Sequence, residues 1–138
     1  MRVLSLDVGD RRIGLALSDP THTLAQALEV LTRTTAKKDL EALKKIAVDH
    51  DVGEIVVGLP KDLSGAMGKR GQSVADFAAE IERVTGLPVV LWDERFSTNE
   101  ANRIFEMHQV NSKKRKPFID MMAAQIILQG YLDGKKNQ

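Results

Sequence analysis

The chain begins with Met1-Arg-Val-Leu-Ser-Leu-Asp-Val-Gly-Asp-Arg-Arg-Ile-Gly14, and this stretch predicts how the fold starts. Residues 3–8 form a short apolar run that is typical of a buried strand. Asp7 lies inside this run and is followed at once by a glycine and a turn. A carboxylate in a buried strand is costly unless it is paired or holds a metal ion. Asp7 is therefore either a metal ligand or a strand-end residue that caps a turn.

Acidic residues at two other places favour the metal ligand. Asp93 and Glu94 close a second apolar strand, and Asp120 stands near the start of an apolar helix. Mg²⁺ is usually held by a few carboxylates together with phosphate oxygens. Adjacent strand residues point to opposite faces, so the sequence does not decide between Asp93 and Glu94. Asp120 could instead only complement the dipole of its helix.

Composition limits the class of protein. The 138 residues are enough for one core, and we expect a single domain over 1–138. The net charge of +1 gives no general argument for a polyanionic partner, and the absence of cysteine excludes disulfides and thiolate metal sites. No apolar stretch approaches the roughly 20 residues that span a bilayer. Because the chain starts directly with a strand, we expect no signal peptide, no membrane contact and a cytoplasmic location.

The order of the expected elements indicates an α/β sheet. Residues 3–8 and 13–18 are apolar strands joined by a connection of hairpin length. The expected elements after this hairpin are a strand over 25–31, a helix capped by Thr34 or Thr35 and running to about 50, a strand over 54–60, a helix over 73–85 ended by Gly86, a strand over 87–92, a helix over 97–107 and a final helix over 118–132 with Pro117 in its first turn. An antiparallel hairpin followed by parallel strands brings the strand ends that carry the acids to one edge of the sheet.

Three groups of basic residues accompany the carboxylates. They are Arg11 and Arg12 after the first strand, Lys69 and Arg70 in a loop over 61–72, and the linker run Lys113, Lys114, Arg115 and Lys116 before the helix of Asp120. A charge run most often covers a solvated face, but beside an acidic metal site it can offset the repulsion of a phosphate backbone. The few aromatic residues favour backbone recognition over base stacking. The three histidines have no ligand spacing and are expected at the surface.

Four motifs follow one another along the chain: Leu6-Asp-Val-Gly-Asp-Arg-Arg-Ile-Gly14, Ile55-Val-Val-Gly-Leu-Pro60, Asp93-Glu-Arg-Phe-Ser-Thr98 and Lys116-Pro-Phe-Ile-Asp120. Together they resemble the YqgF/RuvX family over essentially the whole chain. The resemblance implies an RNase H-like fold, with a five-stranded mixed sheet, an N-terminal antiparallel hairpin and flanking helices. It also implies a metal-dependent nuclease. Members of the family are assigned to maturation of the 5′ end of pre-16S ribosomal RNA, and some are described as resolvase-like on branched DNA.

The resemblance also implies roles for individual residues. Asp7 matches the metal ligand of the first strand, Asp93 or Glu94 the acid after a later strand, and Asp120 the carboxylate of the last helix. Arg95 is implied to lie near the phosphate, which suits its planar fork. Two Mg²⁺ or Mn²⁺ ions would activate water and stabilise the departing oxygen. The implied partners are pre-rRNA, with ribosomal particles, or branched DNA, and the chain would act as a monomer or, as a junction resolvase, as a homodimer.

Two further functions are weighed against the nuclease. The motif from Asp7 onward is similar to the phosphate-binding hairpin of actin-like ATPases and sugar kinases, but those proteins need two lobes and this chain provides one. A non-catalytic nucleic-acid-binding assembly factor could keep the fold, although a binding module gains nothing from three acids facing phosphate. The carboxylates therefore favour a hydrolase acting on phosphodiester bonds. The resemblance alone implies pre-rRNA as its substrate, with a Holliday-junction resolvase-like endonuclease as the alternative.

Overall fold

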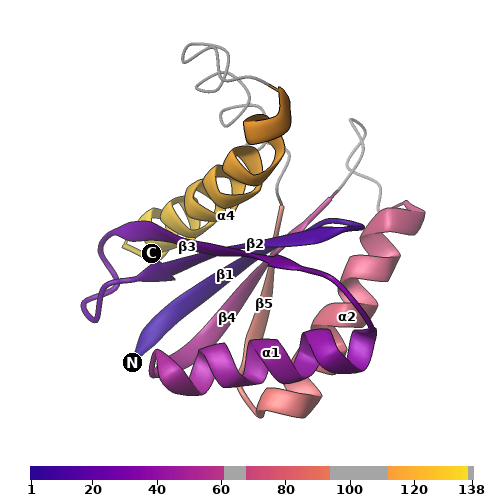
Figure 1. Cartoon of the computed structure of the whole chain (residues 1–138). Coiled ribbons are helices and arrows are strands. Elements are labelled where there is room, and N and C mark those ends of the chain that lie inside the picture. Colours follow the sequence, from indigo (N-terminus) through magenta and orange to yellow (C-terminus); the bar gives the residue numbers. More distant parts are fainter. Residues whose placement is uncertain (61–67, 94–111, 137–138) are drawn as a thin grey trace.

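A computed structural model describes residues 1–60, 68–93 and 112–136, with side chains from 119 to 135 in the last segment. Within these residues five strands form one sheet in the order β3-β2-β1-β4-β5 (Figure 1). The strands are β1 Arg2–Val8, β2 Arg12–Ser18, β3 Ala25–Thr32, β4 Val52–Leu59 and β5 Val89–Asp93. β1, β2 and β3 pair antiparallel, whereas β4 and β5 continue the sheet in parallel with β1. The predicted mixed sheet with an N-terminal antiparallel hairpin is confirmed.

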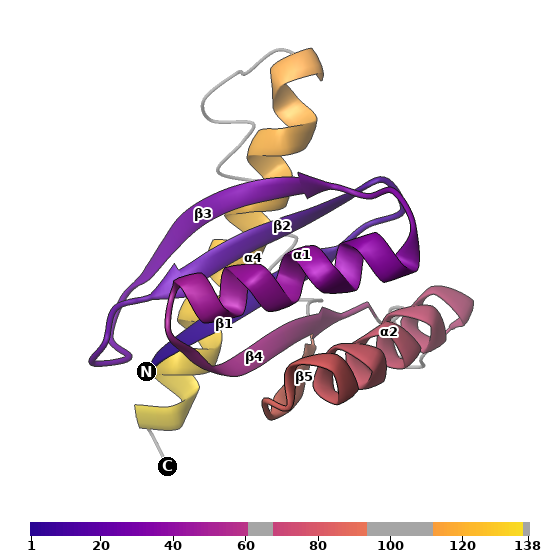
Figure 2. The same cartoon turned by 60° about the horizontal axis from the view of Figure 1, so that its bottom comes forward.

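Helices cover both faces of this sheet (Figures 1 and 2). They are α1 Ala36–Asp49 and α2 Lys69–Thr85 on one face and α4 Ser112–Lys136 on the other. Because strand residues alternate between faces, each side has its own apolar core. The α1/α2 side buries Leu4, Leu6, Val8, Ile13, Leu15, Leu43, Ile55, Val57 and Ile81. The α4 side buries Val3, Ala16, Val56, Ala124, Ile127, Leu128 and Leu132. None of the helices in the described segments is both long and apolar enough to cross a membrane.

Local signals explain the helix ends that the sequence predicts well. The Thr35 hydroxyl accepts a hydrogen bond from the Lys38 N–H at 3.2 Å and so caps α1. Gly86 adopts the left-handed conformation, with φ of 71°, and ends α2. Both predicted ends are confirmed.

Two helix starts differ from the prediction. α2 begins at Lys69 rather than at residue 73, so Lys69 and Arg70 lie in its first turn instead of a loop. Its N-cap is Gly68, which makes no side-chain hydrogen bond and gives no capping signal in the sequence. α4 begins at Ser112, so the run over 113–116 is helical rather than a linker and Pro117 lies beyond the first turn. Lysine and arginine are good helix formers, which favours this extension. The predicted helix over 97–107 lies outside the described residues.

Candidate metal and nucleic-acid site

Asp7 lies near the carboxyl end of the central strand β1 and on its α4 side. Val3 and Ser5 share its position in the strand alternation and contact α4. Val3 belongs to the core beneath that helix, and the Ser5 hydroxyl donates a hydrogen bond to the Ala124 carbonyl at 2.7 Å. Val8, with the opposite alternation, packs in the core beneath α1 and α2. The Asp7 side chain is therefore directed to the α4 face.

Gly14 brings the last helix to the same place. It pairs with Asp7 across β1 and β2, and directly paired residues share a face of the sheet. A Cβ atom at Gly14 would lie 2.0 Å from the carbonyl oxygen of Asp120. The missing side chain is what allows the α4 backbone to approach so closely. The fold thus brings together two of the predicted ligands, Asp7 and Asp120, at one end of the α4 face.

Arg12 adds a cation beside these two acids. Its Nε donates to Asp120 Oδ2 at 2.9 Å, and both side chains are partly exposed, by 30% and 23%. Arg12 and Gly14 share one face of β2, because the intervening Ile13 is buried in the α1/α2 core. Of the first predicted basic group, Arg11 and Arg12, the second residue therefore lies on the α4 face. Arg11 is exposed and lines a cavity of about 480 Å³ beside the start of α1.

Asp93 ends β5, where it pairs with Leu59 of β4. The preceding Trp92 packs edge-on against Tyr131 of α4, with ring centroids 5.5 Å apart. Because Trp92 faces α4, alternation directs Asp93 to the other side of the sheet. In the part of the chain that the structure describes, no group of three or more His, Cys, Asp or Glu side chains is placed to hold a metal ion. Glu94 follows Asp93 and lies outside that part.

The other predicted basic residues divide between described and undescribed positions. Lys69 and Arg70 begin α2 and line a cavity of about 300 Å³ next to the turn that follows β1. The backbone of 113–116 forms the start of α4. Outside the description are Arg95 and the side chains of Lys113, Lys114, Arg115 and Lys116.

Arg33 is a residue that the sequence analysis does not single out. Its Nη1 donates to the Gly9 carbonyl at 2.9 Å and its Nε to Asp39 Oδ2 at 3.2 Å. The guanidinium also lies 4.9 Å from the centre of the Phe77 ring. In the sequence Arg33 is a single cation after a strand, so no local pattern marks it. Its contacts join the turn after β1 to α1 and α2.

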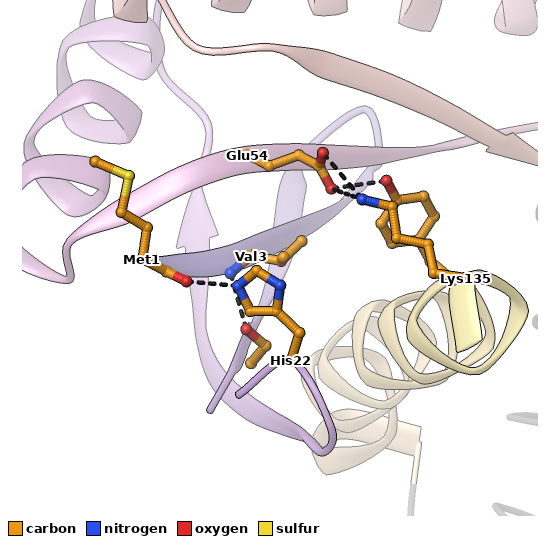
Figure 3. A network of polar contacts seen from close by, with 7 residues as sticks. Met1, Val3, His22, Glu54 and Lys135 are labelled. Atoms are coloured by element: carbon orange, nitrogen blue, oxygen red, sulfur yellow. Dashed lines mark hydrogen bonds and ion pairs between the residues drawn. The ribbon is translucent and has the colours of Figure 1, made fainter. Parts of the chain in front are cut away.

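A separate set of polar contacts lies at the amino-terminal ends of β1 and β4 (Figure 3). The His22 ring is hydrogen-bonded to the Met1 carbonyl at 2.5 Å. On β4, the Glu54 carboxylate accepts hydrogen bonds from the Tyr131 hydroxyl at 2.7 Å and from the Lys135 ammonium at 3.4 Å. Burial and, after it, the hydrogen bond to Glu54 raise the pKa of Tyr131 above 10.0. These contacts hold the amino terminus and α4 in place, and His22 is exposed as expected.

The mixed five-stranded sheet, with helices on both faces, has the fold of the junction resolvases. T. thermophilus RuvC in complex with a Holliday junction substrate has a TM-score of 0.64 at 13% identity, over 100% of this chain and 97% of that one. The Fowlpox virus resolvase in complex with Holliday junction DNA has a TM-score of 0.60 at 9% identity, over 98% and 99%. At these identities the likeness shows the fold alone.

The sequence comparison identifies the family. The family model described as "RuvX: Holliday junction resolvase" matches residues 1–134, and the chain belongs to this family. A protein of Thermoanaerobacter pseudethanolicus is 45% identical over 139 residues, covering 100% of both chains. A protein of Carboxydothermus hydrogenoformans is 48% identical over 135 residues, covering 98% of both. Both relatives are named as candidate pre-16S rRNA nucleases. The resemblance carried by the four motifs is confirmed.

Proposed function

We propose that the protein is a metal-dependent nuclease that hydrolyses phosphodiester bonds during maturation of the 5′ end of pre-16S rRNA. The observation that carries the proposal is the close approach of α4 to β2 at Gly14, which places Asp120 beside the residue that pairs with Asp7. Two carboxylates brought together at a sheet edge suit cation-assisted phosphodiester chemistry. The names of the relatives support ribosomal RNA as the substrate.

The donor atoms suit a hard divalent cation. Asp7 and Asp120 would supply carboxylate oxygens, which Mg²⁺ and Mn²⁺ prefer. We propose Glu94 rather than Asp93 as the third ligand, because the alternation of β5 directs Asp93 to the side of the sheet opposite α4. When bound, the cation would supply positive charge to the phosphodiester oxygens and to the water that attacks.

The protein's own cations would hold the substrate at this site. Arg12 uses its Nε for Asp120, and the rest of its partly exposed guanidinium can donate to a phosphate oxygen. We propose the same role for Arg95, and for the four basic residues over 113–116, which begin the helix that carries Asp120. These contacts would offset the repulsion between the acids and the nucleic-acid backbone.

A second candidate is a resolvase-like endonuclease that cuts branched DNA. The description of the matching family model favours it. A symmetric four-way junction presents two equivalent strands, so this activity would require a homodimer with two copies of the site. Cleavage of pre-rRNA requires only one copy of the site. Ribosomal particles would then be the partners, and no symmetric dimer is needed.

The test is cleavage of two labelled substrates, a pre-16S 5′ leader RNA and a four-way DNA junction, with Mg²⁺, Mn²⁺ or EDTA. Wild type is compared with Asp7→Asn and with Asp49→Asn, a control on an exposed residue at the end of α1. We expect metal-dependent cutting of the RNA that Asp7→Asn lowers by about a thousandfold, a size typical of losing one electrostatic stabiliser. The control should cut like wild type.

Different outcomes separate the candidate functions. Preferential cutting of the junction would select the resolvase. Cutting by a folded Asp7→Asn protein at the wild-type rate, or cutting in EDTA, would contradict the metal-dependent mechanism. Tight binding without cutting of either substrate would indicate a non-catalytic assembly factor. Mg²⁺ should also raise the Tm of the wild type more than that of Asp7→Asn, since a cation that binds the native state stabilises it.

A further inference from the structure

We propose that a second, metal-independent phosphate site lies on the α1/α2 side of the same sheet edge, formed by Arg33, Lys69 and Arg70. Its ligand would be a phosphodiester group of the nucleic-acid strand. The inference rests on the proposed function, because it assumes a nucleic-acid substrate, and it adds a contact on the face of the sheet opposite the acids.

The first observation is a cavity of about 300 Å³ between the turn after β1 and the start of α2. Gly9 and Asp10 of the turn form one wall, and the first turns of α2 form another, with Ser73 among their residues. Phe77 belongs to the core beneath α1 and α2, which places the cavity on that side of the sheet. The amino-terminal ends of α1 and α2 both lie toward the turn between β1 and β2 (Figure 2).

The second observation is that Arg33 is held in place and still has free donors. Asp39, the Gly9 carbonyl and the Phe77 ring each contact the guanidinium. Asp39 is only 3% exposed and also accepts the Thr34 N–H at 3.0 Å, so it is itself fixed. Two of the five guanidinium N–H groups are used, and Arg33 makes no other side-chain hydrogen bond to the described residues. Its side chain is 25% exposed and lines the cavity, so the remaining donors are preorganised for an anion.

The third observation is the charge of the cavity wall. Lys69 and Arg70 are exposed, and within the described residues neither forms an ion pair. Among the described residues that line the cavity, Asp10 is acidic and Arg33, Lys69 and Arg70 are cationic. The Lys69 and Arg70 side chains stand at the positive end of the α2 dipole, where cations destabilise a helix. A bound phosphate would reverse this repulsion, which gives the unfavourable placement a purpose.

The cavity adjoins a second one that shares Asp10 and Arg33. That cavity has a volume of about 480 Å³ and includes Arg11 and the start of α1. Cations therefore line both hollows beside the turn after β1. A strand whose scissile phosphate lies near Asp7 on the α4 side could cross this turn and place a neighbouring phosphate at Arg33. We infer that the turn lies between two contacts on one strand.

The experiment measures binding of a labelled leader RNA by fluorescence anisotropy in EDTA, at several salt concentrations. The full-length Lys69→Ala/Arg70→Ala double variant is compared with Lys44→Ala/Lys45→Ala, which removes the same charge from exposed positions on α1. Each lost phosphate contact on a single strand lowers the salt slope by about 0.7, so we expect a decrease of about 1.4. We expect a loss of affinity of about tenfold near 0.1 M salt, and less than about twofold for the control.

A further variant, Arg33→Lys, keeps the positive charge but removes the planar guanidinium and its several N–H donors. We expect it to weaken binding by about threefold to tenfold, because an ammonium cannot hold Asp39, Gly9 and a phosphate together. Circular dichroism checks folding, and the Lys69→Ala/Arg70→Ala protein should be at least as heat-stable as wild type, since it loses cations from a helix amino terminus.

Equal affinity and salt slope in the wild type and the Lys69→Ala/Arg70→Ala protein would overturn the inference, as would an equal loss in the α1 control. Absence of RNA binding by the wild type in EDTA would overturn it too. Cleavage is not measured here, so the two proposals fail separately. If RNA binding depends on Lys69 and Arg70 but the protein does not cut RNA with metal, only the nuclease proposal is refuted. If the protein cuts RNA but binding does not depend on these two residues, only the second phosphate site is refuted.

Discussion

Two arginine–aspartate pairs lie on opposite sides of the turn between β1 and β2, and they differ in burial and in the number of their partners. Arg12 and Asp120 share one hydrogen bond of 2.9 Å on the α4 side, and both are partly exposed. Asp39, on the α1/α2 side, is 3% exposed and holds both Arg33 and the Thr34 N–H. The first pair can exchange partners with solvent, whereas the second is fixed by its surroundings.

The Arg12–Asp120 pair can therefore rearrange when a ligand binds, whereas the Arg33–Asp39 pair supports the backbone and stays fixed. Exposed ion pairs contribute about 0–1 kcal/mol, so Asp120 can leave Arg12 for a cation at little cost. Asp39 is buried and holds two donors, so its removal leaves the Thr34 N–H and Arg33 without their acceptor, and the cost is several times larger. Arg33 also holds the Gly9 carbonyl, two residues beyond Asp7, at 2.9 Å. The Arg33–Asp39 pair, anchored by the buried Asp39, therefore keeps the backbone after Asp7 in place while the partly exposed Arg12–Asp120 pair adjusts.

The largest expected effect on stability is that of Asp39→Ala. The substitution removes the partner of Arg33 and the acceptor of the Thr34 N–H, so we expect a loss of about 3 kcal/mol in the free energy of unfolding. Urea denaturation followed by circular dichroism measures it. Asp49→Ala, at an exposed position of the same helix, is the control and should change stability by less than about 0.5 kcal/mol. A loss below about 1 kcal/mol would show that the Arg33–Asp39 pair contributes no more to stability than an exposed pair.

A smaller loss of stability is expected for Gly14→Ala. The added Cβ would meet the Asp120 carbonyl oxygen at 2.0 Å, so α4 must move away from β2. We expect a loss of about 2 kcal/mol, typical of overpacking, together with a weaker Mg²⁺-dependent rise in Tm. Gly68→Ala is the matched control, because its Cβ would meet no heavy atom of the described residues within 4 Å and its φ of −81° suits alanine. Equal stabilities of the two variants would contradict the close approach.

The sequence predicts the sheet well because its signals are local. The apolar hairpin, the Thr35 cap and the Gly86 stop each depend on a few neighbouring residues. The start of α2 is wrong by four residues because Gly68 offers no capping side chain, and Lys69 and Arg70 reverse the usual charge preference of a first turn. The predicted beginning of α4 is wrong because proline is typical of a first helical turn, whereas here good helix formers before Pro117 extend the helix to Ser112.

The site is less predictable because it depends on contacts between distant segments. Asp7 can be found from sequence, since a charge interrupts an apolar run. The face to which Asp93 is directed follows from the packing of Trp92 on Tyr131 of α4, a contact between segments 39 residues apart that no local pattern indicates. Arg33 has its decisive contact with Gly9, 24 residues away, and no spacing rule indicates it.

For the exposed pair, Arg12→Gln should change stability by less than about 1 kcal/mol. If Asp120 helps to hold Mg²⁺, removal of the neighbouring cation should tighten Mg²⁺ binding by up to about fivefold, the equivalent of 1 kcal/mol. The dependence of Tm on Mg²⁺ concentration measures this. Arg11→Gln, one residue away and exposed, is the control and should leave Mg²⁺ affinity unchanged. Unchanged or weaker Mg²⁺ binding in Arg12→Gln would contradict a role for Asp120 as a ligand.

The smallest expected effect concerns Asp19, an acid held by hydrogen bonds without an arginine. The Thr21 hydroxyl, followed by the N–H groups of Leu24 and Thr23, holds the pKa of Asp19 well below its ordinary value of 3.8. A lowered pKa in the folded state adds stability above the ordinary pKa, and that stability is lost as the pH falls toward the folded value. Urea denaturation of wild type and Asp19→Asn should therefore show a constant difference from about pH 7 to 5 that shrinks below about pH 4. A constant difference down to about pH 2.5 would mean that these donors do not select the charged form, and that a carboxylate here needs an arginine partner, as Asp39 has.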